Sequence, residues 1–273
     1  MNRIALIFIL LFKFHFSFSQ GYKYVGARSN SMANASVAFV DGWAYHHNPG
    51  ALGDLKKAEI GISYENRFLL KDLQSQGLVY SQPIKTGAIS FGAQLFGLNT
   101  YRTYRLGGGY SLKLSEKLFA GVQLNYQNIH FSSNYGSKSS VTAEVGIYVK
   151  LTNEWKIGVS VFNLGRTKLN SFENERFTTL MRLGSVYQLS KNVLFALEAE
   201  KNMNYQLRLK GAVEYKPIKN FFLRGGLATQ PIEFTFGCGY KLKAIQIDLG
   251  SAFHQLIGWS PHFSLTYSFD KPN

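Results

Sequence analysis

The feature that most constrains the fold is an alternation of apolar and polar residues that recurs from about residue 57 to the end of the chain. In the run from 141 to 151, for example, apolar residues alternate with Thr142, Glu144, Gly146 and Lys150. A period of two residues is typical of β-strands with one apolar and one polar face. About fourteen such runs occur, each of roughly 9–13 residues, which is the length that a tilted membrane-spanning strand requires. The predicted strands are 57–66, 74–82, 86–97, 102–114, 117–131, 138–151, 154–163, 177–189, 192–201, 205–216, 220–228, 231–242, 244–254 and 261–269.

Two properties of these runs favour a membrane β-barrel over the alternative, a large secreted β-sandwich. The runs are longer than the five or six residues that are about average for soluble strands. Their polar face also carries many charges, which would line the lumen of a barrel while the apolar face meets lipid. We therefore predict an all-β fold, a transmembrane antiparallel β-barrel of about 14 strands over residues 57–273, in the outer membrane. The charged residues are Arg105, Glu144, Arg182, Glu198, Glu200, Arg208, Lys210, Glu214, Arg224, Glu233 and Asp248.

The connections between the predicted strands alternate in length. Short polar links such as Ser115-Glu116, Thr152-Asn153 and Lys243 fall at every second junction, and the longer loops include 66–73, 132–137, 163–176 and 255–261. Short periplasmic turns and longer outer loops are usual in such barrels, and an even number of strands places both termini on the periplasmic side. The last run ends on aromatic residues up to Phe269, as strands read by the barrel-insertion machinery do.

Residues 1–20 are predicted to be a cleaved secretory signal peptide. Arg3 supplies the positive start, residues 4–12 the apolar core, and Ser17 and Ser19 the small-residue cleavage site. The alternative, a transmembrane anchor, needs roughly 18–20 apolar residues, and this run is interrupted by Lys13 and His15. The single cysteine, Cys238, excludes an internal disulfide.

Residues 21–56 lack the strand alternation and are predicted to form a plug. Ala27, Ser31, Ala35 and Ala38 recur at spacings of three and four, which indicates a short helix packed in a confined space. Asp41-Gly42 and Asn48-Pro49-Gly50 are turn sequences. We expect this segment to lie inside the barrel. The alternative is a helix lying across the outside of the sheet.

The same segment resembles the N-terminal signature of the FadL-like outer-membrane barrels, and most closely their PorV/PorQ branch in Bacteroidetes-type bacteria. One departure is Gly50, where that family typically has Asn-Pro-Ala. The resemblance implies an accessory of protein export or surface attachment that works with the type IX secretion machinery or its cargo. Its FadL side implies instead a passive route for hydrophobic small molecules, and a purely structural role is a third alternative. The motif residues are Ala27, Arg28, Met32, Asp41, Asn48 and Pro49.

Charges of opposite sign on neighbouring predicted strands form a lumen charge ladder. Because these side chains face the same side of the sheet, opposite charges on neighbouring strands would form ion pairs. Pairing is favoured because an unpaired charge enclosed in the barrel costs free energy. The ladder is either an ion-selective or ligand-orienting device, or a structural support that fills a narrow lumen. Its members are Arg182, Glu198, Glu200, Arg208, Lys210, Arg224 and Glu233.

No sequence motif indicates catalysis, a metal or a cofactor, and we predict none. The adjacent residues His46 and His47 would point about 100° apart on a helix, which is poor geometry for a shared metal. A hydrolytic triad needs a serine, a histidine and an orienting polar group, and nothing marks His130 with Ser132, or His254 with Ser251, as such a pair beyond chance.

The expected partners follow from charge and from exposed apolar residues. The net charge of +14 fits the phosphates of lipopolysaccharide, with solubilising loops as the alternative, and does not require nucleic acid. Aromatic residues near strand ends, such as Trp155 and Tyr187, are expected to form an interfacial girdle in outer-membrane lipid. A hydrophobic small ligand would contact loop residues Phe68, Leu69, Leu256 and Trp259.

Overall fold

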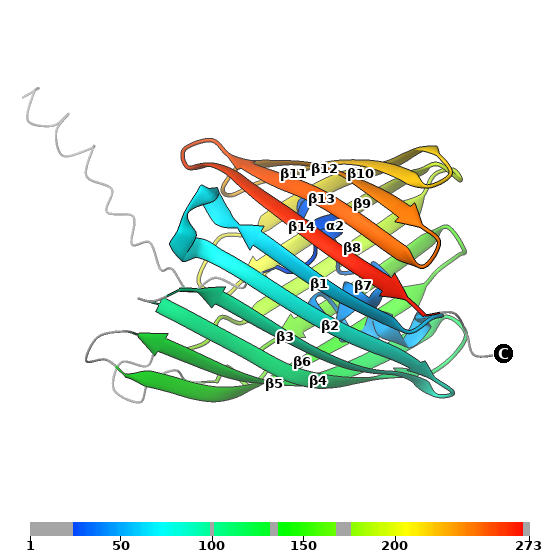
Figure 1. The fold of residues 1–273 in the computed structure, drawn as a ribbon. Helices are drawn as coiled ribbons and strands as arrows, with labels where there is room; N and C mark the ends of the chain where they lie inside the picture. The colour runs from blue at the N-terminus through cyan, green and yellow to red at the C-terminus, as the bar shows by residue number, and fades with distance from the viewer. Residues whose placement is uncertain (1–23, 99–100, 132–135, 168–175, 270–273) are drawn as a thin grey trace, which may run out of the picture.

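The computed structural model describes residues 24–98, 101–131, 136–167 and 176–269, in which fourteen antiparallel strands close into a barrel (Figure 1). The barrel is closed because β1 pairs with both β2 and β14. The predicted all-β barrel is therefore confirmed, and the sandwich alternative is wrong. The predicted signal peptide, residues 1–20, lies outside the described residues. The strands are β1 (Glu59–Asn66), β2 (Gln74–Ile84), β3 (Gly87–Gly97), β4 (Tyr101–Lys113), β5 (Leu118–Phe131), β6 (Ser137–Lys150), β7 (Trp155–Phe162), β8 (Leu180–Gln188), β9 (Val193–Asn202), β10 (Arg208–Ile218), β11 (Phe221–Ala228), β12 (Glu233–Leu242), β13 (Ile245–His254) and β14 (Gly258–Ser268).

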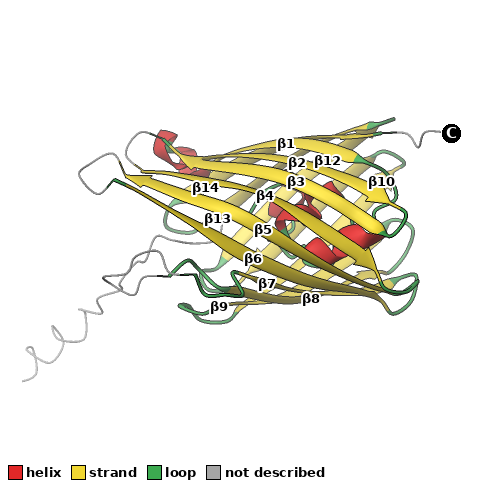
Figure 2. Cartoon of the chain, turned by 90° about the horizontal axis from the view of Figure 1, so that it is seen from below, coloured by secondary structure: helices red, strands yellow, loops and turns green. Residues whose placement is uncertain are grey.

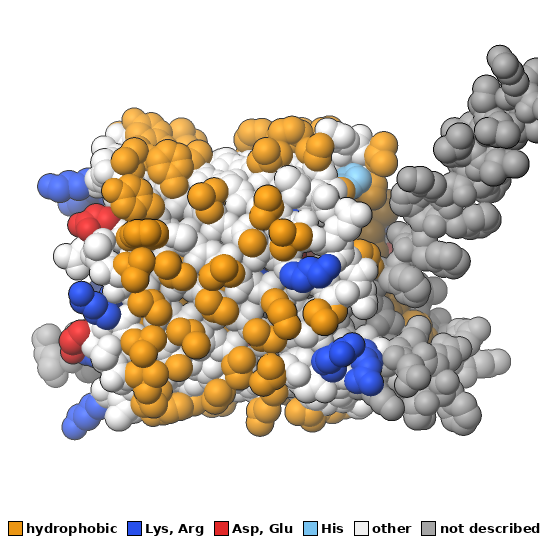
Figure 3. All heavy atoms as spheres, turned by 180° about the vertical axis from the view of Figure 1, so that it is seen from behind, with side chains coloured by type: hydrophobic (Ala, Val, Ile, Leu, Met, Phe, Trp, Pro, Cys, Tyr) orange, Lys and Arg blue, Asp and Glu red, His pale blue; other side chains and the backbone are white. Residues whose placement is uncertain are grey.

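The two faces of each strand have the predicted environments. On β6, Val141 and Ile147 point outward and are exposed, whereas Thr142 and Glu144 are buried inside the barrel. Figure 3 shows the outward apolar side chains spread over the barrel wall. The inward face is not wholly polar, because Tyr148 on β6 is also fully buried in the interior. The outer surface is thus suited to lipid, and the lumen holds a mixed core.

The strand starts differ most, by three residues, at β8 and β10, which begin later than predicted, and at β14 in the last hairpin. β14 begins at Gly258 and not at residue 261, because Gly258, Trp259 and Ser260 pair with the end of β13. The predicted loop 255–261 is therefore only residues 255–257.

The two ends of the barrel differ. Six hairpins are closed by two to four residues at one end, which we call the turn end, and β1 starts and β14 finishes there. The opposite end, the loop end, carries the connection between β1 and β2, with the helices η3 (Arg67–Leu69) and η4 (Lys71–Leu73), and the connection between β7 and β8. Figure 2 shows both ends from the side. No helix among the described residues is long and apolar enough to cross a membrane.

The N-terminal segment lies inside the barrel, as Figures 1 and 2 show. Ala27, Met32 and Leu52 have no exposed surface, so the alternative of a helix on the outside is wrong. The predicted short helix is only the single turn α2 (Ala27–Asn30), followed by the 3-10 helices η1 (Gly42–His46) and η2 (Pro49–Asp54). The helix stops early because Ala33 and Asn34 both adopt left-handed backbone angles. We call residues 24–56 the plug.

The plug runs along the lumen from one end to the other. Tyr24 lies at the loop end, where it lines a cavity with Arg67 and Arg208. Asp54 and Lys56 lie at the turn end, beside Lys243. The start of β1 and the end of β14 lie at the same end of the barrel, as predicted for the two ends of the chain. Tyr24, the first described residue, lies at the opposite end.

Candidate functional site

The candidate site is the contact between the plug and the inner wall of the barrel, and Arg28 joins the two. Its guanidinium donates to Asp41 within the plug at 3.1 Å and, through two nitrogens, to Glu214 on β10 at 3.0 and 3.1 Å. It also lies 4.5 Å from the ring centroid of Phe39. Arg28 and Asp41 of the N-terminal motif thus bind each other, and Arg28 also binds the wall.

Asn48 and Pro49 shape the second half of the plug. The Asn48 side chain accepts from the backbone N–H of Gly50 at 3.0 Å and donates to the carbonyl of Ile147 on β6 at 3.0 Å. The carbonyl of Pro49 accepts from the hydroxyl of Ser111. A side chain on Gly50 would place its Cβ 2.6 Å from the backbone of β6. This close contact explains why residue 50 is a glycine.

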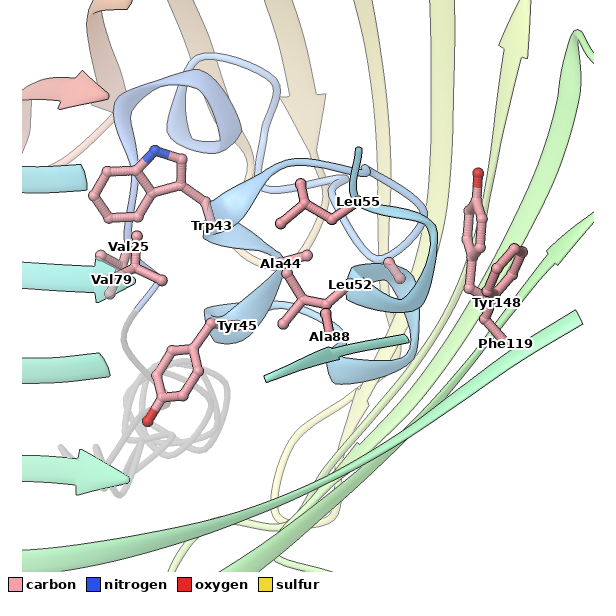
Figure 4. Packing of buried hydrophobic residues seen from close by; sticks show 11 residues of the cluster. Val25, Trp43, Ala44, Tyr45, Leu52, Leu55, Val79, Ala88, Phe119 and Tyr148 are labelled. Atoms are coloured by element: carbon pink, nitrogen blue, oxygen red, sulfur yellow. The ribbon is translucent and has the colours of Figure 1, made fainter. Parts of the chain in front are cut away.

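Two buried apolar clusters fill the space around the plug. In the first, Met32, Ala35, Ala38 and Phe39 of the plug pack against apolar residues of β8, β9 and β10. In the second, the plug packs against β2, β3, β5 and β6, as Figure 4 shows. The members of the second cluster are Val25, Trp43, Ala44, Tyr45, Ala51, Leu52, Leu55, Val79, Ala88, Phe119 and Tyr148.

Polar contacts hold the second cluster in place. The indole N–H of Trp43 donates to Thr266 on β14 at 2.9 Å, and the Tyr45 hydroxyl donates to the carbonyl of Gly92 on β3 at 3.2 Å. The backbone N–H of Ala27 donates to Ser264 at 3.1 Å. These three plug residues are therefore bound to strands that are distant in sequence.

All seven residues of the predicted charge ladder face the lumen, and its centre is a buried network around Glu198. Glu198 accepts from Arg182 at 2.8 Å and from Lys210 at 2.9 Å, and Lys210 also donates to Glu200 at 2.5 Å. The other carboxylate oxygen of Glu198 accepts from the backbone N–H of Val37 in the plug at 2.9 Å. The ladder is therefore continuous with the plug.

The same network reaches three more residues of the plug. Arg182 donates to the backbone carbonyls of His47 at 3.0 Å and Asn34 at 2.9 Å. Tyr24 donates its hydroxyl to Glu200 and accepts from Lys210 at 3.0 Å. A buried ion that loses its partner is strongly destabilised, so these contacts resist displacement of the plug.

The remaining ladder residues make ion pairs both between neighbouring strands and across an intervening strand. Arg208 lies 3.4 Å from Glu233, and Arg224 contacts both Glu214 at 2.6 Å and Asp248 at 2.7 Å. Glu214 and Asp248 were identified as polar-face charges but not as ladder members. Their alternation put them on the right face, but the Arg208–Glu233 and Arg224–Asp248 contacts each skip one strand and depend on the curvature of the wall.

The two histidines of the plug are enclosed. Burial lowers the pKa of both His46 and His47 below the ordinary value, and neighbouring Arg105 and Arg182 lower it further. Both imidazoles are therefore neutral at physiological pH. In the described part of the chain, no three His, Cys, Asp or Glu side chains are grouped to hold a metal ion.

The four predicted ligand-contacting residues do not converge on one pocket. Phe68 lines a small cavity at the loop end and packs edge-on against His254. Leu69 is exposed, and Leu256, at the tip of the last hairpin, is 91% exposed. Trp259 lies on β14, not in a loop, and its ring packs against Phe253 at 4.8 Å on the outward face. The alternation of β14 sets that direction, because Ser260 takes the inward position.

The fold is similar to that of several solved outer-membrane barrels. The monoaromatic hydrocarbon channel CymD aligns with a TM-score of 0.70 and 14% identity, covering 91% of this chain and 99% of that one. The Ralstonia pickettii toluene transporter TbuX aligns at 0.67 and 12%, covering 92% and 100%. A Pseudomonas aeruginosa FadL homologue aligns at 0.60 and 13%, covering 90% and 98%. At these identities the likeness concerns the fold alone.

Comparison of the sequence with models of protein families assigns the chain to a family. No curated protein matches the chain. The model of the family described as type IX secretion system membrane protein PorP/SprF matches residues 42–273, which include η1, η2 and the whole barrel. The PorV/PorQ resemblance is not confirmed by these comparisons. The chain belongs to the PorP/SprF family of type IX secretion system membrane proteins.

Proposed function

We propose that the protein is an accessory of protein export or surface attachment that works with the type IX secretion machinery. The observation that carries this proposal, beyond the family, is that the plug occupies the lumen and is bound to the wall by the Arg28–Glu214 ion pair and by hydrogen bonds to buried charged side chains. Such a barrel offers its two ends and its lipid face to other molecules in place of an aqueous passage. The charge ladder then serves as a structural support, not as an ion-selective pathway.

The proposal includes an orientation and surroundings. The loop end faces the cell exterior and the turn end the periplasm, as is usual for barrels of this kind. Residues 1–20 act as a cleaved signal peptide, the apolar outer face contacts outer-membrane lipid, and cationic loops contact the phosphates of lipopolysaccharide. The more specific likeness to PorV/PorQ proteins rests on the motif in residues 26–52. The role is non-catalytic and requires no cofactor.

The test is made in the native bacterium. The gene is deleted, and proteins at the cell surface and in the medium are quantified by mass spectrometry in the deletion strain and after complementation. The proposal predicts selective loss of one or more surface proteins and their return on complementation. An unchanged set of surface and secreted proteins would contradict it.

A second candidate is passive transport of hydrophobic small molecules. It is favoured by the fold and by a cavity of about 290 Å³ at the loop end, beside Tyr24, Leu180 and Tyr205. Uptake of radiolabelled toluene and of a long-chain fatty acid is measured in the same strains. Slower uptake on deletion, with the surface proteins unchanged, would support this candidate over the first.

A further inference from the structure

The turn end of the barrel carries a ring of lysines. Each of its six hairpins has a lysine in the turn or at the strand residue that leads into it. Figure 3 shows several Lys or Arg side chains projecting from the left-hand edge of the barrel. One lysine from each hairpin is Lys85, Lys117, Lys150, Lys191, Lys219 and Lys243.

Several lysines at the turn end point toward the mouth of the barrel, not toward lipid. Lys113 and Lys241 each lie two residues beyond a buried inward position on the same strand. Lys150 contacts Asp54 of the plug at 2.6 Å, so it also faces inward. The outward positions next to them are apolar and exposed, for example Leu112 and Leu242. A lipid annulus would therefore meet leucine here, whereas a molecule seated over the mouth would meet lysine.

Some of the lysines at the turn end line a groove. It has a volume of about 310 Å³ and lies between the end of the plug and the turn that joins β12 to β13. Lys56, Lys57, Lys241 and Lys243 line it, together with the carboxylates of Asp54 and Glu59.

Both carboxylates of the groove already have partners within the chain. Asp54 accepts from Lys56 at 2.7 Å and from Lys150 at 2.6 Å. Glu59 accepts from the backbone N–H of Gly42 at 2.6 Å and from Ser268 at 3.1 Å. The groove therefore keeps an excess of positive charge.

We infer that the turn end is a docking surface for an acidic polypeptide segment. The inference deepens the proposed export function and rests on it for its biological meaning. An extended chain with several carboxylates can reach lysines around the mouth at once, and electrostatic complementarity speeds and selects such encounters. The inward direction of the lysines favours this partner over the headgroups of anionic lipid.

The test uses the full protein in nanodiscs of zwitterionic lipid and a fluorescein-labelled oligoglutamate peptide as the probe. Anisotropy measures binding to the wild type, to Lys241→Glu/Lys243→Glu, and to a control, Lys71→Glu/Lys138→Glu. The control makes the same charge change with exposed lysines at the loop end. Heat-modifiable migration on gels verifies that each variant is a folded barrel.

We expect binding to the wild type, at least about a tenfold weaker affinity for Lys241→Glu/Lys243→Glu, and an unchanged affinity for the control within about twofold. Equal affinity for both variants would overturn the inference. So would loss of peptide binding to the wild type when phosphatidylglycerol is added to the nanodisc, because lipid would then occupy the surface. The binding assay does not depend on protein export. If the wild type binds the peptide but deletion of the gene leaves the surface proteins unchanged, the proposed export function is rejected and the docking surface is not.

Discussion

The two sides of the barrel hold the plug by different means. The lumen faces of β8 to β13, which we call the charged wall, hold it with ion pairs and charge-assisted hydrogen bonds centred on Glu198 and Glu214. The lumen faces of β14 and of β1 to β7, the packed wall, hold it mainly with close contacts and neutral hydrogen bonds around Trp43, Tyr45 and Pro49. Charged contacts of this wall with the plug lie at the turn end, where Lys150 pairs with Asp54 and Glu59 accepts from the backbone of Gly42.

The two walls therefore constrain the plug in different ways: the charged wall sets its position, and the packed wall allows its backbone to approach closely. Buried ion pairs are demanding in geometry and costly to leave unpaired, so the charged wall sets where the plug sits. The packed wall admits the plug backbone only because small residues line it. A Cβ on Gly158 would lie 2.1 Å from the carbonyl oxygen of Val37, and one on Gly121 would lie 2.4 Å from the backbone of Pro49. Four substitutions test this comparison, from the largest expected effect to the smallest.

Glu198→Ala should have the largest effect. It leaves Arg182 and Lys210 buried with one partner fewer and removes the acceptor of the Val37 N–H. We expect the free energy of unfolding to fall by about 3–5 kcal/mol. The measurement is urea unfolding of the protein folded into lipid vesicles, followed by tryptophan fluorescence. A loss below about 1 kcal/mol would show that the charged wall does not hold the plug.

Gly158→Val should have the next largest effect, because the new side chain meets plug backbone that cannot move aside without breaking other contacts. Overpacking of this kind costs about 1–3 kcal/mol. The control is Gly211→Val, at a position where an added Cβ meets only the side chain of Leu197, at 3.5 Å. The same unfolding assay compares them, and equal stability of both variants would contradict close packing at the packed wall.

Trp43→Phe tests one neutral hydrogen bond of the packed wall. Phenylalanine keeps an aromatic ring at this site, but it is smaller than tryptophan and lacks the N–H that donates to Thr266. We expect a loss of about 1 kcal/mol, well below that for Glu198→Ala. The midpoint of heat-modifiable gel migration reports it. A loss equal to that of Glu198→Ala would erase the distinction between the two walls.

Glu116→Ala should have the smallest effect. Glu116 pairs with Lys113 at 2.6 Å, but its side chain is 87% exposed at the turn end. Exposed ion pairs contribute little to stability, because water and salt screen them. We expect an unchanged unfolding curve. A marked loss of stability would mean that this exposed ion pair contributes as the buried pairs do.

The strands and the charged wall could be predicted from the sequence because alternation fixes the face of every strand residue. Arg182 and Glu198 were placed in the lumen on that basis, and the structure puts them there. Their contacts with the plug could not be predicted, since the plug has no period that ties it to a strand. The left-handed backbone at Ala33 and Asn34 divides what the small-residue spacing suggests is one helix.

The packed wall was largely missed for a related reason. Phe119 and Tyr148 occupy inward positions and complete an apolar cluster, although alternation alone assigns that face to polar residues. The signal was present in the sequence, because both aromatic residues are out of phase with the apolar residues beside them. Trp259 was assigned to a loop because Pro261 was taken as the first strand residue, whereas Pro261 pairs within the β13–β14 ladder.

The central claim is that the plug closes the lumen, and single-channel conductance in a planar lipid bilayer tests it most directly. The full chain is compared with a variant that lacks residues 26–52 and that has passed the heat-modifiable migration test for a folded barrel. We predict no ion conductance for the full chain and a stable open channel for the deletion. A conducting full chain, with the same current as the deletion, would contradict the account.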